Sequence, residues 1–173
     1  MALLPIRIYG DPFLKKKAAD IKHLSEVQSL IDDMFETMYE NKGVGLAAVQ
    51  VGKGMNLFVI NAAWEKEDRN KGVEEVFINP VILKMHGKNC NMEEGCLSVP
   101  DLREDVRRKE MVDIEYTDRH GKKRSETGVC GMRARVIQHE FDHLHGILFV
   151  DRLPPTKKLF LKKELRRLAE ENS

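Results

Sequence analysis

The sequence predicts an α+β fold in which mostly antiparallel strands pack around one central helix, with an N-terminal helix and a C-terminal helix outside them. Short apolar or alternating runs follow one another closely in the middle of the chain, which is typical of paired strands. A turn-forming segment at 118–121 follows one such run and indicates a hairpin, so we expect antiparallel pairing. Longer segments with apolar residues at three- and four-residue spacing lie outside these runs and predict the helices.

Length and composition predict a single domain spanning residues 1–173. A chain of 173 residues can bury one sizeable core but is too short for two ordinary domains. Hydrophobic residues make up 42% and charged residues 33%, as in soluble globular proteins. No apolar run approaches the roughly 20 residues of a membrane-spanning helix and no secretory signal is visible, so we expect a cytoplasmic protein with no membrane partner. The net charge of +1 excludes an overall attraction to nucleic acid.

The first helix follows an extended N-terminal arm. Apolar residues recur every three or four positions from Leu24 to Met38, which predicts a helix with one face in the core. Ser25 and Gln28 have the spacing of a capping box, and Gly43 supplies the stop.

Short strands are predicted next, at 57–60, at 76–78 with a continuation at 81–83, and at 111–116. Their apolar or alternating residues have the period of a strand. The charged stretch 65–71 is expected to be a solvated loop.

The second strong helix pattern runs from about Gly131 to His145, with Gly146 as its stop. The apolar run 147–150 is expected to form one more strand. Two prolines then separate this run from a basic C-terminal helix at 156–173, in which lysines and arginines surround apolar residues.

A five-residue motif with metal-binding spacing lies inside the second helix. His139 and His143 are four residues apart, so both imidazoles lie on one face and can bind one ion. Glu140 lies close enough on the helix surface to take a proton from a metal-bound water. The motif predicts a metal-dependent hydrolase, and its alternative is a charged helix with two incidental histidines.

A catalytic metal needs a third protein ligand and one position left for water. The place six residues after His143, where some zinc proteases have a histidine, is occupied by Phe149. Glu164 has a suitable separation for the glutamate of other zinc proteases, but it stands between basic pairs that favour a surface ion pair. Cys96 is the stronger candidate, because a thiolate is a good ligand for a soft divalent ion.

The other two cysteines, Cys90 and Cys130, are expected to be reduced. Three cysteines in a chain without an export signal form no even disulfide framework. Nothing near Cys90 or Cys130 suggests chemistry, so each is expected to be a small buried apolar side chain.

Three segments together carry a resemblance to a known family. They are GVGLAAVQ at 43–50, EGCLSVP at 94–100 and QHEFDHLHG at 138–146. In order and spacing they resemble the three signature motifs of the peptide deformylases, and the resemblance extends over residues 6–153. It implies removal of the formyl group from the N-terminal formyl-methionine of newly made proteins, with nascent N-formyl-methionyl peptides as substrates and formate as a product.

The resemblance also implies roles for individual residues. The implied metal ligands are Cys96, His139 and His143. The implied catalytic glutamate is Glu140. Gln50 would donate its side-chain amide to the formyl oxygen together with the backbone N–H of Leu97, and such donors suit the negative charge that develops there. Gly45 would let the backbone lie beside the substrate.

Further positions match the family's substrate pocket. The positions matching the walls of its methionine pocket are Val44, Met92, Met132, Arg135 and His139. Arg135 suits an apolar pocket only if its aliphatic stem lines the wall and its charge reaches water. Arg103 matches a position that approaches the peptide backbone, and Arg133 is a departure, because many relatives have an apolar residue there. Asp142 either orients a ligand histidine or is an ordinary surface residue.

The metal and the partners follow from the same reasoning. Two histidines and a thiolate accept iron(II), zinc, nickel or cobalt, and the resemblance implies one iron(II) ion per chain. The C-terminal helix is expected to pack with a solvated face, and weak docking on ribosomal RNA is a further hypothesis for it. Two rival functions stay open, a metalloprotease that uses Glu164 and a non-enzymatic RNA-binding protein with a structural metal. Structural metal sites normally have four protein ligands, whereas three are evident.

Overall fold

An antiparallel sheet organises the chain. In the computed structural model, which describes residues 2–63, 68 and 71–172, this sheet has five strands in chain order. They are β1 Gly45–Ala47, β2 Leu57–Ile60, β3 Glu75–Cys96, β4 Val99–Thr117 and β5 Lys123–Val129. The 3₁₀ turns η1 Pro12–Lys15 and η3 Ala48–Val51 lie before and after β1. Each strand pairs antiparallel with the next along the chain, and helices accompany the sheet, so the predicted α+β class is confirmed.

Strands β3 and β4 form a hairpin much longer than the sequence predicted. Their pairing runs from Ile78 opposite Thr117 to Cys96 opposite Val99. The two apolar runs on either side of Asn79 belong to one strand, joined by a bulge at which Asn79 has a φ of 50°. From Lys84 to Glu94 most side chains of β3 are polar, and all but that of Glu94 are partly or fully exposed, so this stretch lacks the apolar pattern by which a strand is recognised in a sequence.

The hairpin turn predicted at 118–121 joins β4 to β5 and is confirmed. Asp118 Oδ1 accepts hydrogen bonds from the backbone N–H groups of His120 (2.9 Å) and Lys122 (3.0 Å). The short polar side chain therefore closes the turn, as is common for aspartate.

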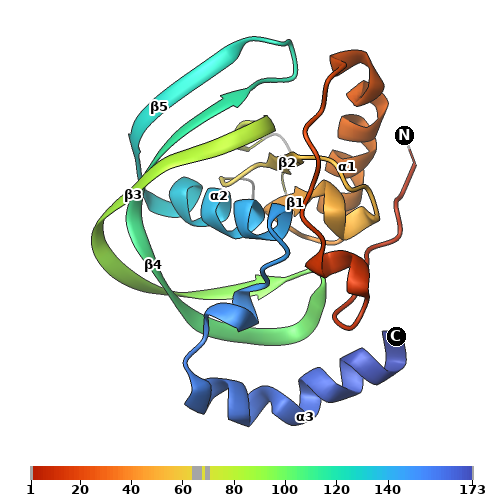
Figure 1. Cartoon of the computed structure of the whole chain (residues 1–173), viewed down its shortest axis with the longest axis vertical. Helices are drawn as coiled ribbons and strands as arrows, with labels where there is room; N and C mark the ends of the chain where they lie inside the picture. The colour runs from red at the N-terminus through yellow and green to blue at the C-terminus, as the bar shows by residue number, and fades with distance from the viewer. Residues whose placement is uncertain (1, 64–67, 69–70, 173) are drawn as a thin grey trace.

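The helix α2, Gly131–Leu144, lies inside the curve of the β3–β4 hairpin (Figure 1). Every side chain from Ala134 to Glu140 is buried, and Ile137 packs with residues of β2, β3 and β4 in one core cluster. The predicted helix and its stop at Gly146, which has a φ of 72°, are confirmed. The predicted metal motif is therefore held in the interior of the molecule.

The helix α1, Gln28–Glu40, begins slightly later than expected, after a 3₁₀ turn η2 at Leu24–Glu26. The prediction of a capping box between Ser25 and Gln28 is wrong. Val27 is the N-cap residue and its side chain makes no cap hydrogen bond, while Gln28 Nε2 donates to a backbone carbonyl in η2 (3.3 Å). The methionine-bearing face of α1 packs against β1 and β2 in a second core cluster, as expected.

The strand expected at 147–150 is wrong. Phe149–Arg152 forms a 3₁₀ turn, η4, in which Asp151 Oδ2 accepts the backbone N–H of Leu148 (2.8 Å). The run is apolar because its side chains pack with residues of β4 in a third core cluster. Period alone does not separate a short apolar strand from a buried turn.

The predicted C-terminal helix is confirmed as α3, Pro155–Asn172, which lies on the outside of the molecule (Figure 1). Leu168 is its buried side chain. Within the described part of the chain, every helix is too short or too polar to span a membrane. The loop expected at 65–71 falls almost wholly outside the described residues.

The N-terminal arm hydrogen-bonds to all three motif segments. The backbone N–H groups of Arg7 and Tyr9 donate to the carbonyls of Gln50 and Ser98, both at 2.7 Å. Further along, the arm donates to the carbonyl of Leu144, the last residue of α2 (2.9 Å). These hydrogen bonds connect three segments that are far apart in the sequence to the backbone of the N-terminal arm.

Candidate metal centre and active site

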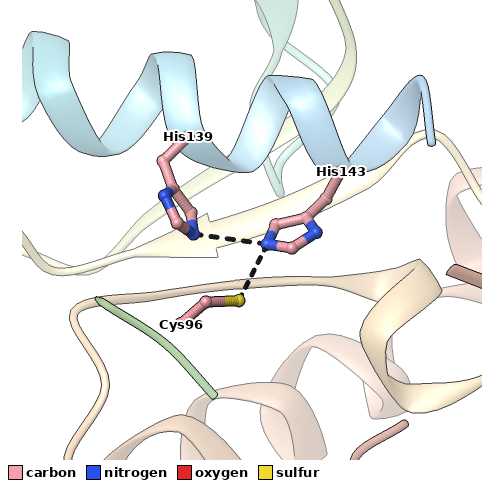
Figure 2. A group of neighbouring side chains, drawn as sticks. All are labelled: Cys96, His139 and His143. Atoms are coloured by element: carbon pink, nitrogen blue, oxygen red, sulfur yellow. Dashed lines mark hydrogen bonds between the residues drawn. The ribbon is translucent and has the colours of Figure 1, made fainter. Parts of the chain in front are cut away.

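Two histidines of α2 and the cysteine at the end of β3 point toward one another (Figure 2). Nε2 of His143 lies 3.3 Å from Nε2 of His139 and 3.3 Å from Sγ of Cys96. The three potential ligand atoms all lie within 4.8 Å of one another. Helical spacing brings the imidazoles together, whereas the tight β3–β4 turn, which also contains Leu97, brings the sulfur to them.

This set of side chains fits a divalent transition-metal ion. Sulfur and imidazole nitrogen are the ligands that zinc, iron and neighbouring ions take in proteins. Burial lowers the pKa of His143 well below its usual value, so the ring is neutral and offers a lone pair. Within the described part of the chain three ligands meet here, which leaves a position for water or substrate.

The buried carboxylate of Glu94 orients His139, and sequence reasoning missed it. Glu94 Oε2 accepts a hydrogen bond from His139 Nδ1 (2.9 Å), which leaves Nε2 to face the other ligands. Burial raises the pKa of Glu94, but hydrogen bonds from His139 and Arg108 outweigh burial and hold this pKa well below its usual range. A signal was present, because Glu94 lies two residues before Cys96 and alternate residues share one face of a strand.

Glu140 is buried beside Gly45. A Cβ at position 45 would lie 2.5 Å from Glu140 Oε1, so the glycine makes room for the carboxyl group. None of the described side chains hydrogen-bonds to Glu140 Oε2. Burial raises the pKa of Glu140 to about 7, so this group can both accept and release a proton near neutral pH.

Gln50 holds its side-chain amide toward Cys96. Its Oε1 accepts the backbone N–H of Ala47 (2.8 Å), which fixes the orientation of the amide. Its Nε2 donates to Ser98 Oγ (3.1 Å) and lies 3.5 Å from Cys96 Sγ. The amide nitrogen therefore faces the sulfur of Cys96 as well as Ser98, and Ser98 is a second residue that sequence reasoning missed.

Known proteins match this chain over most of its length. The sequence model of the polypeptide deformylase family matches residues 3–159. The chain belongs to the peptide deformylase family. A peptide deformylase from Christiangramia forsetii is 46% identical, covering 97% of this chain and 90% of the relative. One from Cytophaga hutchinsonii is also 46% identical, covering 97% and 91%. The crystal structure of peptide deformylase from Thermus thermophilus has a TM-score of 0.89 and 43% identity, covering 98% of this chain and 99% of that one.

As a peptide deformylase, the chain is a metal-dependent hydrolase that removes the formyl group from the N-terminal formyl-methionine of newly made proteins and releases formate. The predicted activity is confirmed. The rival readings as a metalloprotease and as a non-enzymatic RNA-binding protein are wrong. Glu164, the ligand that the protease reading required, is paired with Arg167 on the surface of α3 (3.2 Å).

Arg135 differs from the expectation for a wall of the deformylase pocket. Its guanidinium is buried and does not reach water. Nη1 donates to Glu94 Oε1 (2.9 Å), and Nη2 donates to the carbonyl of Cys90 (2.8 Å). The guanidinium points into the protein because it stabilises the buried carboxylate of Glu94. The other non-ligand positions matched to the pocket, half-buried or exposed, are Val44, Met92 and Met132.

Asp142 was expected either to orient a ligand histidine or to be an ordinary surface residue, and both expectations are wrong. It is buried rather than on the surface, and it accepts hydrogen bonds from Arg108 (2.7 Å) and Arg152 (2.6 Å) rather than from a ligand histidine. Arg108 also donates to Glu94, so Asp142 is linked to His139 through Arg108 and Glu94.

The remaining arginines that the sequence singled out make ion pairs. Arg133 bonds to Glu75 (2.7 Å) and Glu126 (2.8 Å), which explains how a charged residue is accommodated there. Arg103 is exposed and pairs with Glu93 (3.2 Å).

The three cysteines are free, as expected. Cys90 and Cys130 were both expected to be buried. Cys130 is exposed, so that prediction is wrong, and Cys90 is only partly buried. Cys130 directly precedes α2 as its N-cap residue, a position that the apolar character of cysteine does not reveal.

Proposed function

We propose that Cys96, His139 and His143 hold one divalent metal ion and that Glu140 carries the proton during formyl hydrolysis. The observation that supports this assignment is that the sulfur of Cys96, at the end of β3, lies within 4.8 Å of two imidazole nitrogens from the helix that also bears Glu140. When bound, the ion supplies the Lewis acidity that makes water a competent nucleophile near neutral pH.

Glu140 performs both proton transfers of the reaction. It accepts a proton from the attacking water, because its pKa of about 7 matches the working pH. As the bond between the formyl carbon and the methionine nitrogen breaks, Glu140 returns this proton to the departing amine. The products are formate and a free N-terminal methionine.

Gln50 and Leu97 stabilise the charge that develops on the formyl oxygen. The side-chain amide of Gln50 is buried and held by Ala47 and Ser98, so its N–H group needs no reorientation to donate. The backbone N–H of Leu97 is the second donor. Gly45 lies beside the substrate, where its lack of a side chain also makes room for Glu140.

Formate release from a formyl-methionyl peptide tests the role of Glu140. Glu140→Ala is expected to lower kcat by about 10²- to 10⁴-fold while the bound metal stays near one ion per chain. Glu171→Ala, on the exposed end of α3, is the matched control and is expected to leave kcat unchanged. A Glu140→Ala variant with more than a tenth of the activity would contradict the assignment.

Metal content tests the ligand set. Cys96→Ala is expected to lose the ion, whereas Glu164→Ala is expected to retain it. Loss of metal in the Glu164 variant alone would overturn the assignment of Cys96.

The native ion in this proposal is iron(II), although zinc, nickel and cobalt also suit a thiolate and two imidazoles. Iron(II) is oxidised by air, so activity is expected to decay aerobically and to persist in protein loaded with nickel. Metal analysis of anaerobically prepared protein would reject the assignment if it found another ion at one equivalent.

We further propose that the protein acts in the cytoplasm and docks weakly on the ribosome through α3. This helix has exposed lysines and arginines around the exposed side chains of Leu159 and Phe160. Lys162→Glu combined with Lys163→Glu is expected to abolish a salt-sensitive co-sedimentation with ribosomes. The same change at Lys122 and Lys123, which are also exposed, is the matched control. Binding that is absent, or that does not weaken with salt, would contradict this docking.

A further inference from the structure

Arg135 joins the metal-bearing helix to both strands of the long hairpin. Its Nη1 donates to Glu94 Oε1 (2.9 Å) and to the backbone carbonyl of Val106 on β4 (2.8 Å). Its Nη2 donates to the carbonyl of Cys90 on β3 (2.8 Å). The side chain is only 6% exposed, so these contacts replace water almost completely.

The carboxylate of Glu94 is held on both of its oxygens. Arg108 donates to Oε1 (2.6 Å) and to Oε2 (3.0 Å), Arg135 donates to Oε1, and His139 Nδ1 donates to Oε2 (2.9 Å). Two guanidinium groups and one imidazole therefore fix both the position and the rotation of this carboxylate.

Arg108 alone does not balance the buried negative charge. It also bonds to Asp142 through Nη1 (2.7 Å), and the further cation beside Asp142 is Arg152 (2.6 Å), whose side chain is 40% exposed, so Arg108 is the buried cation that both carboxylates share. A buried carboxylate without a full counter-charge is costly and moves or takes up a proton. Arg135 supplies the second buried cation next to Glu94, and it comes from the same helix as His139.

We infer that Arg135 is a positioning residue for the metal centre, acting through Glu94 on His139. By fixing Glu94, it keeps the Nδ1–H of His139 donating to Oε2 and Nε2 facing Cys96 and His143. This inference rests on the proposed ligand set. Partners that orient a ligand histidine in this way typically change metal affinity about 10- to 100-fold when they are lost.

Arg133 is a matched control for this inference. It lies two residues earlier on α2 and ties the helix to the sheet through Glu75 and Glu126. These contacts also anchor the helix, through half-buried ion pairs, but they do not involve Glu94. A role of Arg135 in packing alone would therefore be matched by Arg133.

The test measures the dissociation constant for cobalt(II) by chelator competition, together with the visible absorption spectrum of the cobalt-loaded protein. Arg135→Met is expected to raise this constant about 10- to 100-fold and to change the spectrum, while Arg133→Met changes the constant less than about threefold. In a Glu94→Gln background, Arg135→Met is expected to have less than about a threefold effect, because the group through which it acts has lost its charge. Thermal unfolding of each variant reports the packing contribution separately.

Equal losses of affinity in the two arginine variants, or an undiminished effect of Arg135→Met in the Glu94→Gln background, would overturn the inference. If Arg135→Met does not fold, Arg135→Lys, which keeps the charge but not the fork of donors, is measured in the same cycle. Failure of the proposed ligand set would be a different result, namely wild-type protein that binds no cobalt or His139→Ala protein that binds it as tightly as wild type.

Discussion

Gly45 is the residue at which the first motif contacts Glu140, the proposed proton carrier on α2. A Cβ added there would lie 2.5 Å from Glu140 Oε1 and 2.9 Å from its Cδ, so the carboxyl group would have to move. We expect Gly45→Ala to lower kcat for formate release by about 10²-fold, because small displacements of a catalytic group cost this much. Bound metal is expected to stay unchanged.

Gly54→Ala provides the comparison. The nearest atom to a Cβ at this position is Phe13 Cζ at 3.7 Å, so the methyl group fits and activity is expected to persist. If both alanine variants kept full activity, the tight contact at position 45 would have no role in placing Glu140.

The buried carboxyl of Glu140 also predicts how stability depends on pH in the metal-free protein. Burial raises its pKa from 4.5 to about 7, so between these values the folded state keeps a proton that the unfolded state has released. Stability from this group is therefore present below the unfolded pKa and is lost as the pH rises through the folded pKa. Relative to Glu140→Gln, metal-free wild type is expected to lose up to about 3 kcal/mol between pH 4.5 and 8.

Urea unfolding of the two metal-free proteins at a series of pH values measures this difference. Subtracting the variant removes the titration of the other groups that both proteins share. Parallel curves for the two proteins would mean that burial does not perturb Glu140.

At the scale of elements, the bulge in β3 depends on one side chain. Asn79 has a φ of 50°, and its side chain exchanges two hydrogen bonds of 2.8 Å with the backbone of Ile21. Asparagine tolerates this left-handed conformation better than most residues. Its side-chain amide makes the two hydrogen bonds to the backbone of Ile21 that a neighbouring strand would otherwise make. The bulge therefore anchors the N-terminal arm as well as bending the strand.

We expect Asn79→Ala to lower the free energy of unfolding by about 3 kcal/mol, since it loses two hydrogen bonds and places alanine in the left-handed region. Asn79→Gly removes the hydrogen bonds without the backbone strain, so a loss of about 2 kcal/mol is expected. Chemical denaturation measures both values. A glycine variant less stable than the alanine variant would contradict the account of the backbone.

At the scale of the whole molecule, the arm fits closely against the end of α2. A Cβ at Gly146 would lie 2.4 Å from the carbonyl oxygen of Lys15 and 2.7 Å from its carbonyl carbon. Both are backbone atoms, which cannot turn aside as a flexible side chain can. The glycine that ends the helix is therefore also the point at which the arm approaches it.

Gly131 and Gly146, at opposite ends of α2, make a matched pair, with φ values of 68° and 72°. A Cβ at Gly131 meets no atom within 4 Å, so Gly131→Ala is expected to cost about 1 kcal/mol of stability from backbone strain alone. Gly146→Ala is expected to cost about 3 kcal/mol or more, because the arm must also shift. Equal losses in denaturation experiments would show that the arm does not constrain this end of the helix.

Local chemistry is what the sequence determined by itself. The spacing of His139 and His143 fixes their common face, and Gly146 marks the end of their helix, because both follow from the geometry of one helix. Ligand chemistry made Cys96 the stronger candidate for the third ligand. The resemblance of the three motifs added the deformylase activity. Neither conclusion needed a contact between distant segments to be known.

Only the tertiary structure decided the partners of the buried charges and the true length of the central hairpin. Glu94, Arg108 and Arg135 come from β3, β4 and α2, and the sequence pattern of one element does not specify which distant charge will face it. The run 147–150 was misassigned for the same reason, since its burial comes from packing against β4 rather than from its own period. The pattern that predicts a helix or strand depends on residues that are close in the sequence. The free-energy cost of burying a charged side chain is offset by residues that are close in space.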